Sequence, residues 1–443
     1  MIAPARQVAT RVLFRVAERG AWTAPALDAE IGRARMDRRD AALATAIVYD
    51  TLRVVPVLDA ALAAHLRQPG TSLDGLVRAA LRVGAYQLLH LSRVPAHAVV
   101  ADAVEIVSRE RSRQLGGLVN AVLRKVAKQR PELPEPPQTI AVPPWLEGRL
   151  TPSLGPERAR AFLVARQLPP PIGLRVRAGL SRASVLDRIR AARPEARIEP
   201  GTLSPAALLV RGAGDPRRLP GYAEGALSVQ EQGAQVIGLL VGAQPGERVA
   251  DACAGRGGKT SQLAEAVGQG GHVTAIDVNE PKLEHVFEDL DRLGINRERV
   301  DVEAVDLTVG VAGLAGSFDR VLVDAPCTGL GTVHRRPELL LRLGPDDPAR
   351  VAELQLAIAS RAASLVRPGG LIVYAVCSPT REEGIGVVER VSAAVGDLEP
   401  APEPWPLEGI ASDPDGMVRL GPWAGDADAY QIWRWRRRSS PGR

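Results

Sequence analysis

The three cysteines of this sequence are the residues whose placement most favours covalent chemistry. Cys253, Cys327 and Cys377 each lie at or next to the end of a predicted strand. A buried cysteine is more often an unreactive small hydrophobe, but ligands of open α/β sheets bind at the carboxyl ends of the strands. Three cysteines in 443 residues also cannot form a disulfide framework. We therefore expect free thiols at a ligand-binding edge.

Two of these cysteines lie in motifs that suit methylation of a pyrimidine ring. Cys327 ends the motif Asp324-Ala-Pro-Cys, and Cys377 precedes Ser378. Carbon 5 of cytosine is a weak nucleophile, but a thiolate that adds to carbon 6 lets carbon 5 attack a sulfonium methyl group. One cysteine must add, another group must help it leave, and Asp324 could hydrogen-bond the base and supply a proton. Because the base must leave its stack, the substrate is expected to be single-stranded or extruded RNA.

A glycine-rich turn after the first predicted strand favours a nucleoside-type cofactor. The loop of residues 251–260 contains three glycines before a predicted helix, so its backbone can approach a ligand at the helix N-terminus. Asp277 ends the second strand and could accept both hydroxyls of a ribose. A phosphate-binding P-loop is disfavoured, because it needs a glycine where Cys253 stands. Lys259 is one of four lysines in the chain, which marks it as a candidate functional residue.

The first part of the chain is predicted to be an all-helical domain over residues 5–130. Apolar residues recur there at helical spacing, with breaks at prolines and glycines. The amphipathic stretches cover residues 6–19, 38–64, 74–91, 98–109 and 116–130. Six prolines within residues 131–144 predict a boundary after this domain, because such a segment can continue neither a helix nor a central strand.

The remainder of the chain is predicted to contain a connector and an α/β domain. Residues 145–225 combine a helix near 156–167 with a strand at 173–176, which predicts a small α+β connecting region. Residues 226–438 predict a Rossmann-like, doubly wound α/β domain with a mostly parallel sheet. Its short apolar strands alternate with helices and cover residues 248–252, 273–277, 300–305, 320–324 and 371–375.

Charge and hydropathy restrict the partners and the compartment. Residues 1–130 hold 20 Lys and Arg against 11 Asp and Glu, whereas the whole chain has a net charge of +5. A basic front part favours a phosphate backbone as its partner. No apolar run approaches the roughly 18 residues of a membrane span, and no signal-peptide pattern begins the chain. We therefore expect a cytoplasmic monomer that binds RNA and no membrane.

At the cysteine motifs and the glycine loop, the sequence resembles the Nol1/Nop2/Sun family of RNA cytosine-5 methyltransferases. Residues 5–130 resemble the NusB-like helical RNA-binding domain of the family's long form. Residues 118–124 resemble the end of that domain, and residues 229–235 resemble the segment that leads into the catalytic domain. The resemblance implies S-adenosyl-L-methionine as the cofactor and RNA as the substrate, with 16S ribosomal RNA as the nearest match.

The resemblance also implies a role for each matching residue. Cys377 would be the nucleophile, and Cys327 would assist release of the methylated base. Arg335 would lie near the RNA backbone, and no metal is expected. The cofactor-binding positions would be Cys253, Ala254, Gly255, Arg256, Gly257, Gly258, Lys259, Asp277, Asp306 and Asp324.

The sequence departs from the family pattern at three places. Gly255 and Arg256 replace an alanine and a proline of the cofactor loop, and Val376 replaces a threonine that could orient the thiolate. A near-terminal Asp-Gly-Phe-Phe is represented at best by residues 428–431. Two alternatives therefore stay open, namely a methyltransferase acting on tRNA and a catalytically impaired RNA-binding or ribosome assembly factor.

Two histidines and the C-terminus are given mainly structural interpretations. His97 and His334 have no evident partner in the sequence, so a structural or RNA-surface role is expected for each. The arginine-rich tail interleaves aromatic residues, which could stack on RNA. We instead favour a last strand at residues 432–435 with one buried face, followed by a frayed end over 436–443.

Overall fold

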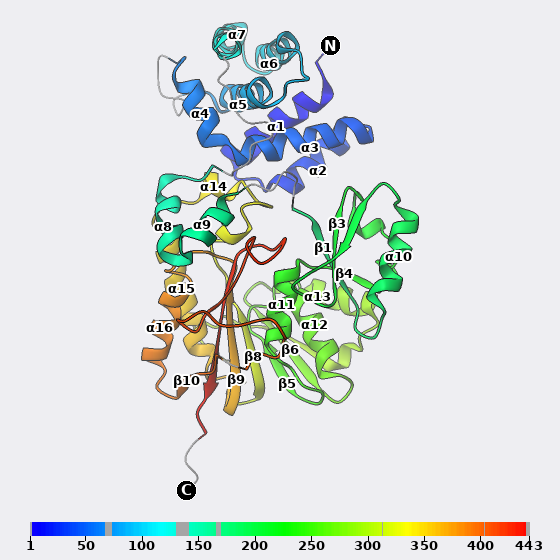
Figure 1. The fold of residues 1–443 in the computed structure, drawn as a ribbon, viewed down its shortest axis with the longest axis vertical. Coiled ribbons are helices and arrows are strands. Elements are labelled where there is room, and N and C mark those ends of the chain that lie inside the picture. The colour runs from blue at the N-terminus through cyan, green and yellow to red at the C-terminus, as the bar shows by residue number, and fades with distance from the viewer. Residues whose placement is uncertain are drawn as a thin grey trace. The chain divides into compact units, whose positions relative to one another are not determined.

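The computed structural model describes residues 2–66, 73–129, 141–164, 170–311, 313–402 and 404–439. The chain forms two compact units (Figure 1). The helical unit comprises Met1–Gly148, Leu163–Pro169 and Val333–Gly344. The sheet unit comprises Arg149–Phe162, Pro170–Thr332 and Pro345–Arg443. Most of the proline-rich boundary predicted at 131–144 lies outside the described residues.

The helical unit packs its amphipathic helices around α5, which is buried along nearly its whole length. Polar side chains cap the N-termini of several helices by accepting hydrogen bonds from backbone N–H groups, as Asp74 does for α5 and Ser112 for α7. Gly20 ends α1 in the left-handed conformation. The helices are α1 (Pro4–Arg19), α2 (Thr23–Ala34), α3 (Arg38–Arg53), α4 (Val55–Ala63), α5 (Gly75–His90), α6 (Ala96–Glu110), α7 (Arg113–Lys128) and α14 (Leu339–Arg342).

Two details of the helical prediction are corrected. The single stretch expected over 38–64 is two helices, because Val54 leaves the helical conformation with φ −124° and ψ 17°. The helix α2 was not predicted, and no side chain caps its N-terminus. Among the described residues, no single helix has the length and hydropathy of a membrane span, and α3 with α4 reaches them only as a pair bent by 75°.

A short segment of the chain's second half belongs to the helical unit. After Thr332 the chain leaves the sheet unit, and it returns at Pro345. The side chain of Glu338 is buried and accepts the backbone N–H of Thr23, and Arg342 stacks over the ring of Trp22 at 4.2 Å. The segment 333–344 is therefore held by side-chain contacts as well as by the backbone.

The sheet unit contains a small antiparallel sheet with strand order β2-β3-β1-β4. Leu174, Leu208 and Ile189 meet in the core between this sheet and α10. The helix α8 was not predicted, and Pro152 lies inside it. The helix α9 covers residues 156–163 of the helix expected at 156–167. The elements are α8 (Pro144–Leu154), α9 (Pro156–Leu163), β1 (Ile172–Val176), α10 (Arg182–Ala192), β2 (Arg197–Pro200), β3 (Ala207–Arg211), η2 (Pro216–Arg218) and β4 (Leu227–Val229).

The large sheet confirms the Rossmann-like prediction. Its parallel strands follow the order β9-β8-β5-β6-β7, so the order in which successive strands are added reverses between β5 and β8. In such folds the ligand binds at this reversal point. The elements are α11 (Gln232–Leu240), β5 (Arg248–Asp251), α12 (Gly258–Val267), β6 (His272–Asp277), α13 (Glu280–Leu293), η3 (Arg297–Arg299), β7 (Val300–Ala304), β8 (Phe318–Asp324), η4 (Leu330–Thr332), α15 (Asp347–Ala362), β9 (Val366–Val376), α16 (Ile385–Ala394), β10 (Leu398–Pro400), β11 (Val418–Leu420) and β12 (Tyr430–Arg437).

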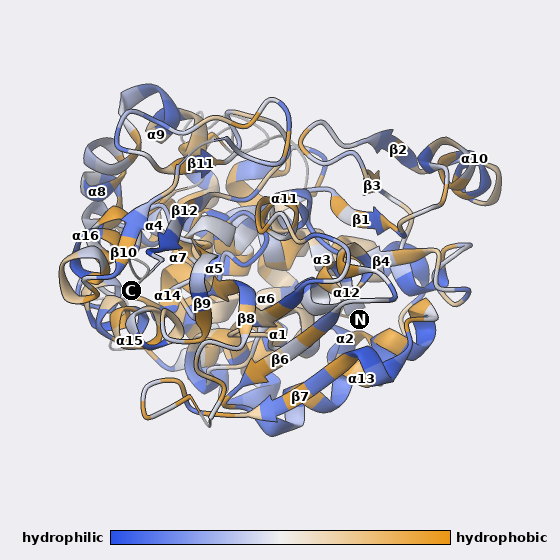
Figure 2. Cartoon of the chain, turned by 90° about the horizontal axis from the view of Figure 1, so that it is seen from below, coloured by the Kyte–Doolittle hydropathy of each residue, from blue (hydrophilic) through white to orange (hydrophobic). Residues whose placement is uncertain are grey.

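Helices cover both faces of this sheet. One core cluster joins α15 and α16 to the strands, and the other joins α11, α12 and α13 to the opposite face. Figure 2 shows hydrophobic residues concentrated along the strands, whereas α13 alternates between hydrophilic and hydrophobic positions. Because helices bury both faces of the sheet, most of its strands are nearly continuous runs of apolar residues in the sequence.

The last strand corrects the prediction for the C-terminus. β12 pairs antiparallel with β9 on one side and with β10 on the other, and residues 430–435 are buried on both faces. Trp435 and Ile432 enter opposite core clusters. The strand extends to Arg437, which pairs with Asp397 at 2.7 Å. The expectations of one buried face and of fraying from residue 436 are therefore wrong.

Candidate active site

The predicted cofactor loop turns from β5 into α12 at the reversal point of the sheet. Gly257 adopts φ 85° as the residue before α12, and a Cβ atom there would meet Val286 at 3.0 Å. Gly255 is also left-handed, with φ 56°. A Cβ atom on Gly255 or Gly258 would meet nothing within 4 Å, so this side of the backbone is open. Unpaired N–H groups at the start of α12 can therefore face a ligand.

Carboxylates of two neighbouring strand ends lie beside this loop. Asp277 at the end of β6 accepts the backbone N–H groups of Gly255 at 2.9 Å and of Asn279 at 2.8 Å. The backbone N–H of Val305 donates to the carbonyl of Asp277 at 3.2 Å, which brings Asp306 to the same edge. The hydroxyl of Thr308 holds the pKa of Asp306 below its usual value. The edge therefore presents anionic oxygens to donor groups of a ligand.

Below the loop, an aspartate is completely enclosed. Asp251 is 1% exposed and accepts the hydroxyl of Thr260 at 2.8 Å, while its other oxygen has no partner among the described residues. Burial raises its pKa to about 6, although the bond from Thr260 works in the opposite direction. Asp251 thus supports the loop from beneath, and sequence reasoning did not single it out.

An ion pair connects the cofactor loop to the first cysteine motif. The ammonium group of Lys259 lies 2.5 Å from Oδ2 of Asp324, at the end of β8. Burial alone would lower the pKa of Lys259, but the charge and hydrogen bond of Asp324 raise it. Oδ1 of Asp324 has no hydrogen-bond partner among the described residues. That oxygen is available to a substrate.

The structure brings two of the three cysteines into direct contact. The sulfur atoms of Cys327 and Cys377 lie 2.9 Å apart, although the residues are 50 positions apart in the sequence. Cys253 is a free cysteine with apolar neighbours, and burial raises the pKa of its thiol. The sequence placed all three at one edge, but the geometry singles out the pair Cys327 and Cys377.

The environment of Cys327 favours the protonated thiol. Its pKa is raised well above the usual value, first by the hydrogen bond with Cys377, then by burial and by nearby negative charge. The charge of Cys377 also acts on Lys259. Cys377 therefore lies within the field of a cation, and the raised pKa of Cys327 suits it to donate the hydrogen bond between the two sulfurs.

Several residues missed from the sequence fix the two cysteine loops. Gly331 donates its N–H to the carbonyl of Cys377 at 2.9 Å and accepts the N–H of Ala429 at 3.0 Å. Gln431 on β12 donates to the carbonyl groups of Ser378 at 2.9 Å and of Thr380 at 2.7 Å. Glu383 is fully buried beneath the same loops. Residues spread over 100 positions of the sequence, from Gly331 to Gln431, carry no periodic signal, so only the fold could connect them.

The residues that depart from the family pattern occupy different surroundings. Val376 is fully buried in the core cluster that contains Tyr374, so its side chain points into packed apolar residues. A threonine at this position would also direct its side chain into the core, and the expected effect of the missing hydroxyl on the thiolate has no support here. Arg256 is exposed at the tip of the cofactor loop.

The predicted RNA-contacting residues lie in the helical unit. Arg335 is half-buried within the segment 333–344, and the carbonyl of His334 accepts a hydrogen bond from Arg53 at 2.9 Å. His97 is exposed at a groove between α6 and α7 with a volume of about 460 Å³. Three exposed cations line the same groove, namely Arg124, Lys125 and Lys128.

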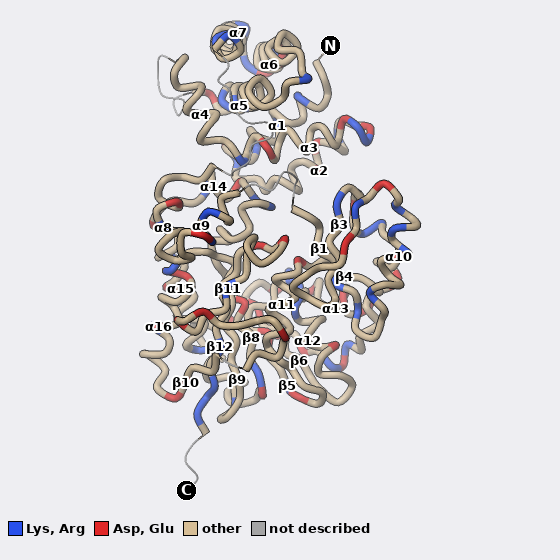
Figure 3. The backbone as a smooth tube through the Cα atoms, viewed as in Figure 1, with Lys and Arg blue, Asp and Glu red and all other residues tan. Residues whose placement is uncertain are grey.

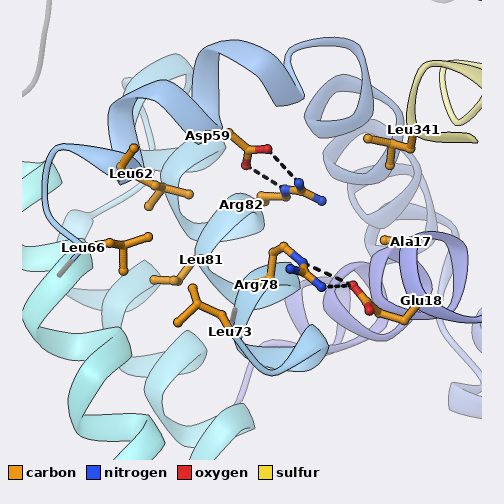
Figure 4. A pocket seen from close by; sticks show the side chains of 11 residues that line it. Ala17, Glu18, Asp59, Leu62, Leu66, Leu73, Arg78, Leu81, Arg82 and Leu341 are labelled. Carbon is orange, nitrogen blue, oxygen red and sulfur yellow. Dashed lines mark hydrogen bonds and ion pairs between the residues drawn. The ribbon is translucent and has the colours of Figure 1, made fainter. Parts of the chain in front are cut away.

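A second cavity of the helical unit, of about 450 Å³, differs from this groove in its charges (Figure 4). Arg82 forms two hydrogen bonds with Asp59, and Arg78 pairs with Glu18. In the α6–α7 groove, by contrast, none of the three cations pairs with an acid in the described part of the chain. Figure 3 shows Lys and Arg positions along α7 in blue.

Family models match both parts of the chain. Residues 239–434 match the model described as 16S rRNA methyltransferase RsmB/F, and residues 3–128 match the NusB family. The "Ribosomal RNA small subunit methyltransferase B" of Pseudomonas syringae is 35% identical over 365 residues, which cover 81% of this chain and 80% of the relative. The "Putative methyltransferase Rv1407" of Mycobacterium tuberculosis is 34% identical and covers 96% and 95%.

Solved structures share the fold. PH0851 superposes with a TM-score of 0.81 at 22% identity and covers 98% of this chain and 99% of its own. NSun6 from Pyrococcus horikoshii, solved with SFG, gives a TM-score of 0.56 at 17% identity and covers 67% and 99%.

The cofactor of this family is S-adenosylmethionine, and the site fits it. Its ribose hydroxyls suit the carboxylate of Asp277, and the open backbone at Gly255 and Gly258 leaves room for the ligand. Together with the matched family model and the full-length relatives, these observations confirm the predicted family. The chain belongs to the RsmB/F family of 16S rRNA methyltransferases and carries an N-terminal NusB domain.

Proposed function

We propose that this chain methylates carbon 5 of a cytosine in 16S rRNA through a covalent bond between Cys377 and carbon 6 of the base. The observation that carries the proposal is the contact between the sulfurs of Cys327 and Cys377, 2.9 Å apart. Two thiols at this distance suit a reaction in which one sulfur must add to the ring and later leave it. The neighbouring Asp324 offers an oxygen to the base.

In the first step, the thiolate of Cys377 bonds to carbon 6, and the electron pair of the ring double bond moves to carbon 5. When bound, S-adenosylmethionine would supply the methyl group: carbon 5 attacks it with that electron pair, and the electron pair of the broken S–CH3 bond leaves with S-adenosylhomocysteine. The pair of Lys259 and Asp324 hydrogen-bonds the base and provides the proton that the ring nitrogen needs as negative charge grows.

In the second step, the adduct is resolved. As the sulfur of Cys377 departs, the proton of Cys327 passes to it, and the thiolate of Cys327 so formed takes the proton of carbon 5. The C–H electron pair restores the ring double bond, the C–S pair leaves with Cys377, and the ring nitrogen returns its proton to the pair of Lys259 and Asp324. Cys377 then releases its new proton to solvent. The raised pKa of Cys327 supports this role, because the residue enters the step as a thiol.

The proposal is tested by the fate of the two cysteine variants. With labelled S-adenosylmethionine and 16S rRNA, the wild-type protein should produce 5-methylcytosine, and Cys377→Ser should produce none. Cys327→Ala should accumulate a protein–RNA adduct that survives denaturation. Adding Cys377→Ser to Cys327→Ala should remove that adduct. Methylation by Cys377→Ser, or an adduct formed by the double variant, would refute the mechanism.

The RNA target is proposed from two observations. The relative from Pseudomonas syringae is named a ribosomal RNA small subunit methyltransferase, and the α6–α7 groove carries three exposed cations without acidic partners in the described residues. Unneutralised cations on a helix suit a phosphate backbone. A parallel reaction with tRNA separates the targets, since preferential methylation of tRNA would overturn the assignment to rRNA. Bisulfite sequencing of host RNA with and without the gene would locate the cytosine.

A further inference from the structure

Glu383 is a carboxylate buried without any exposed surface beneath the two reactive cysteines. One oxygen accepts the backbone N–H of Thr328 at 2.7 Å and the amide of Gln355 at 3.2 Å. The other accepts three hydroxyl groups, from Thr328 at 2.6 Å, Ser378 at 2.5 Å and Thr380 at 3.1 Å. Five donors around one side chain satisfy an ionised carboxylate.

The donors come from both cysteine loops. Thr328 directly follows Cys327, and Ser378 directly follows Cys377. Gln355 on α15 also donates to the carbonyl of Pro326 at 3.0 Å, so the first loop is held on both sides of its cysteine. Glu383 is thus the common acceptor that joins two segments 50 residues apart.

Burying this charge has a cost that the fold does not recover through a cation. Among the described residues, no lysine or arginine donates to Glu383. An enclosed charge without a counter-ion is usually disfavoured unless hydrogen bonds compensate it. A neutral or apolar residue could fill this space at lower cost, which points to a role for the negative charge itself.

We propose that Glu383 is a positioning residue that holds the sulfurs of Cys327 and Cys377 in contact and keeps Cys327 as the thiol, leaving Cys377 to act as the nucleophile. This inference rests on the proposed function. It assigns Glu383 no contact with substrate or cofactor, because its carboxylate oxygens are taken up by the five donors.

The electrostatic surroundings of Cys327 agree with this role. The hydrogen bond with Cys377 contributes most to its raised pKa, followed by burial, and the charges of Cys377, Glu383 and Asp324 add to it. Lys259 faces the site from α12, where it is paired with Asp324. Tyr374 donates its hydroxyl to the backbone carbonyl of Glu383 at 2.7 Å, and burial followed by the charge of Glu383 raises its pKa as well.

The test compares Glu383→Gln with Glu382→Gln. Glutamine keeps the size of Glu383 and removes its charge, and Glu382 is a neighbouring glutamate whose carboxylate pairs with Arg149 at 2.7 Å, away from the donor set. Alkylation of each cysteine is followed by mass spectrometry from pH 7 to pH 10. We expect Cys327 in Glu383→Gln to alkylate at least threefold faster at pH 8, and in Glu382→Gln at the wild-type rate.

Methylation assays supply a second readout. In Glu383→Gln, kcat should fall at least tenfold while KM for S-adenosylmethionine stays within twofold, since the cofactor loop is untouched. Wild-type alkylation of Cys327 together with kcat within twofold of wild type would overturn the inference. If the wild-type protein does not methylate cytosine, the proposed function fails, and the alkylation comparison still decides the role of Glu383.

A second pair of variants covers the case in which Glu383→Gln does not fold. Thr328→Val removes one hydroxyl donor to Glu383 and keeps the side-chain shape, whereas Thr328→Ser restores the hydroxyl. The valine variant should lose at least threefold in kcat, and the serine variant should recover to within twofold of wild type. Equal activities of the two variants would show that the hydroxyl bond to Glu383 does not position Cys327.

Discussion

Lys259 and Asp324 form an ion pair of 2.5 Å that joins the cofactor loop to the cysteine motif of β8. The two side chains are 14% and 30% exposed, so water screens the pair incompletely. The pair therefore links the two halves of the site energetically as well as spatially.

A double-mutant cycle should detect this link in the free energy of unfolding. Lys259→Met and Asp324→Asn should each destabilise the protein, and the double variant should be more stable than their sum predicts by roughly 0.5–3 kcal/mol. Urea unfolding at pH 7 measures all four proteins. The exposed pair of Arg390 and Glu353 is the control, and its coupling should be smaller. Strict additivity for Lys259 and Asp324 would contradict the prediction.

The buried carboxyl of Asp251 predicts an unusual dependence of stability on pH. Its pKa of about 6 in the folded protein exceeds the ordinary value of 3.8, so the folded state binds the proton more tightly. The stabilisation is complete below pH 3.8 and is lost as the pH rises through 6. The difference of about two pKa units corresponds to about 3 kcal/mol.

Asp251→Asn removes this titration and retains an acceptor for Thr260. The unfolding free energy of the variant relative to wild type should therefore be larger at pH 8 than at pH 4.5. Chemical denaturation of both proteins at the two values checks the sign. An unchanged or reversed difference would show that Asp251 titrates normally.

The sequence predicted best those elements of the fold that depend on a single local pattern. The helices of the first 130 residues and the parallel strands follow from apolar periodicity, and the glycine loop follows from its composition. The helix α2 escaped because it contains Pro25 and Gly32, residue types that interrupt a helical pattern. The two buried faces of β12 escaped because they depend on the two core clusters that cover the sheet from opposite sides, which sequence spacing does not reveal.

The candidate site was predictable in its reactive groups and not in its supports. Cys377, Asp324 and Asp277 could be selected from the sequence because a thiol and carboxylates at strand ends are typical reactive and ligand-binding groups. Glu383 and Gly331 support the site through contacts with residues far along the chain, and neither stands out by type or spacing. Their roles depend on the tertiary structure, where the 50 residues between the two cysteine motifs fold back on themselves.

Gly331 predicts a steric requirement next to Cys377, the proposed nucleophile. A Cβ atom on this residue would clash with the carbonyl of Ala429 and lie 2.9 Å from that of Cys377, both of which are backbone atoms that cannot rotate away. Gly331→Ala should lower kcat at least tenfold and destabilise the protein by about 1–3 kcal/mol. Gly396→Ala is the control, since a Cβ atom there meets nothing within 4 Å. Wild-type kcat in Gly331→Ala would show that the loop of Cys377 tolerates displacement.

The α6–α7 groove predicts how salt affects RNA binding. Lys125 and Lys128 are exposed and unpaired within the described residues, so each can release a counterion from a phosphate. Lys125→Gln with Lys128→Gln should weaken binding to 16S rRNA and reduce the slope of log K against log salt concentration by about 0.7 per lost contact.

The matched control for this change is Arg11→Gln with Arg109→Gln. It removes two charges from the same unit, but Arg11 and Arg109 are already neutralised by Glu110 and Glu105. Filter binding is measured between 50 and 300 mM salt, a range over which the Debye length falls roughly twofold. The control should give a slope close to that of wild type. Equal slopes for both double variants would mean that net charge, and not the α6–α7 groove, governs RNA binding.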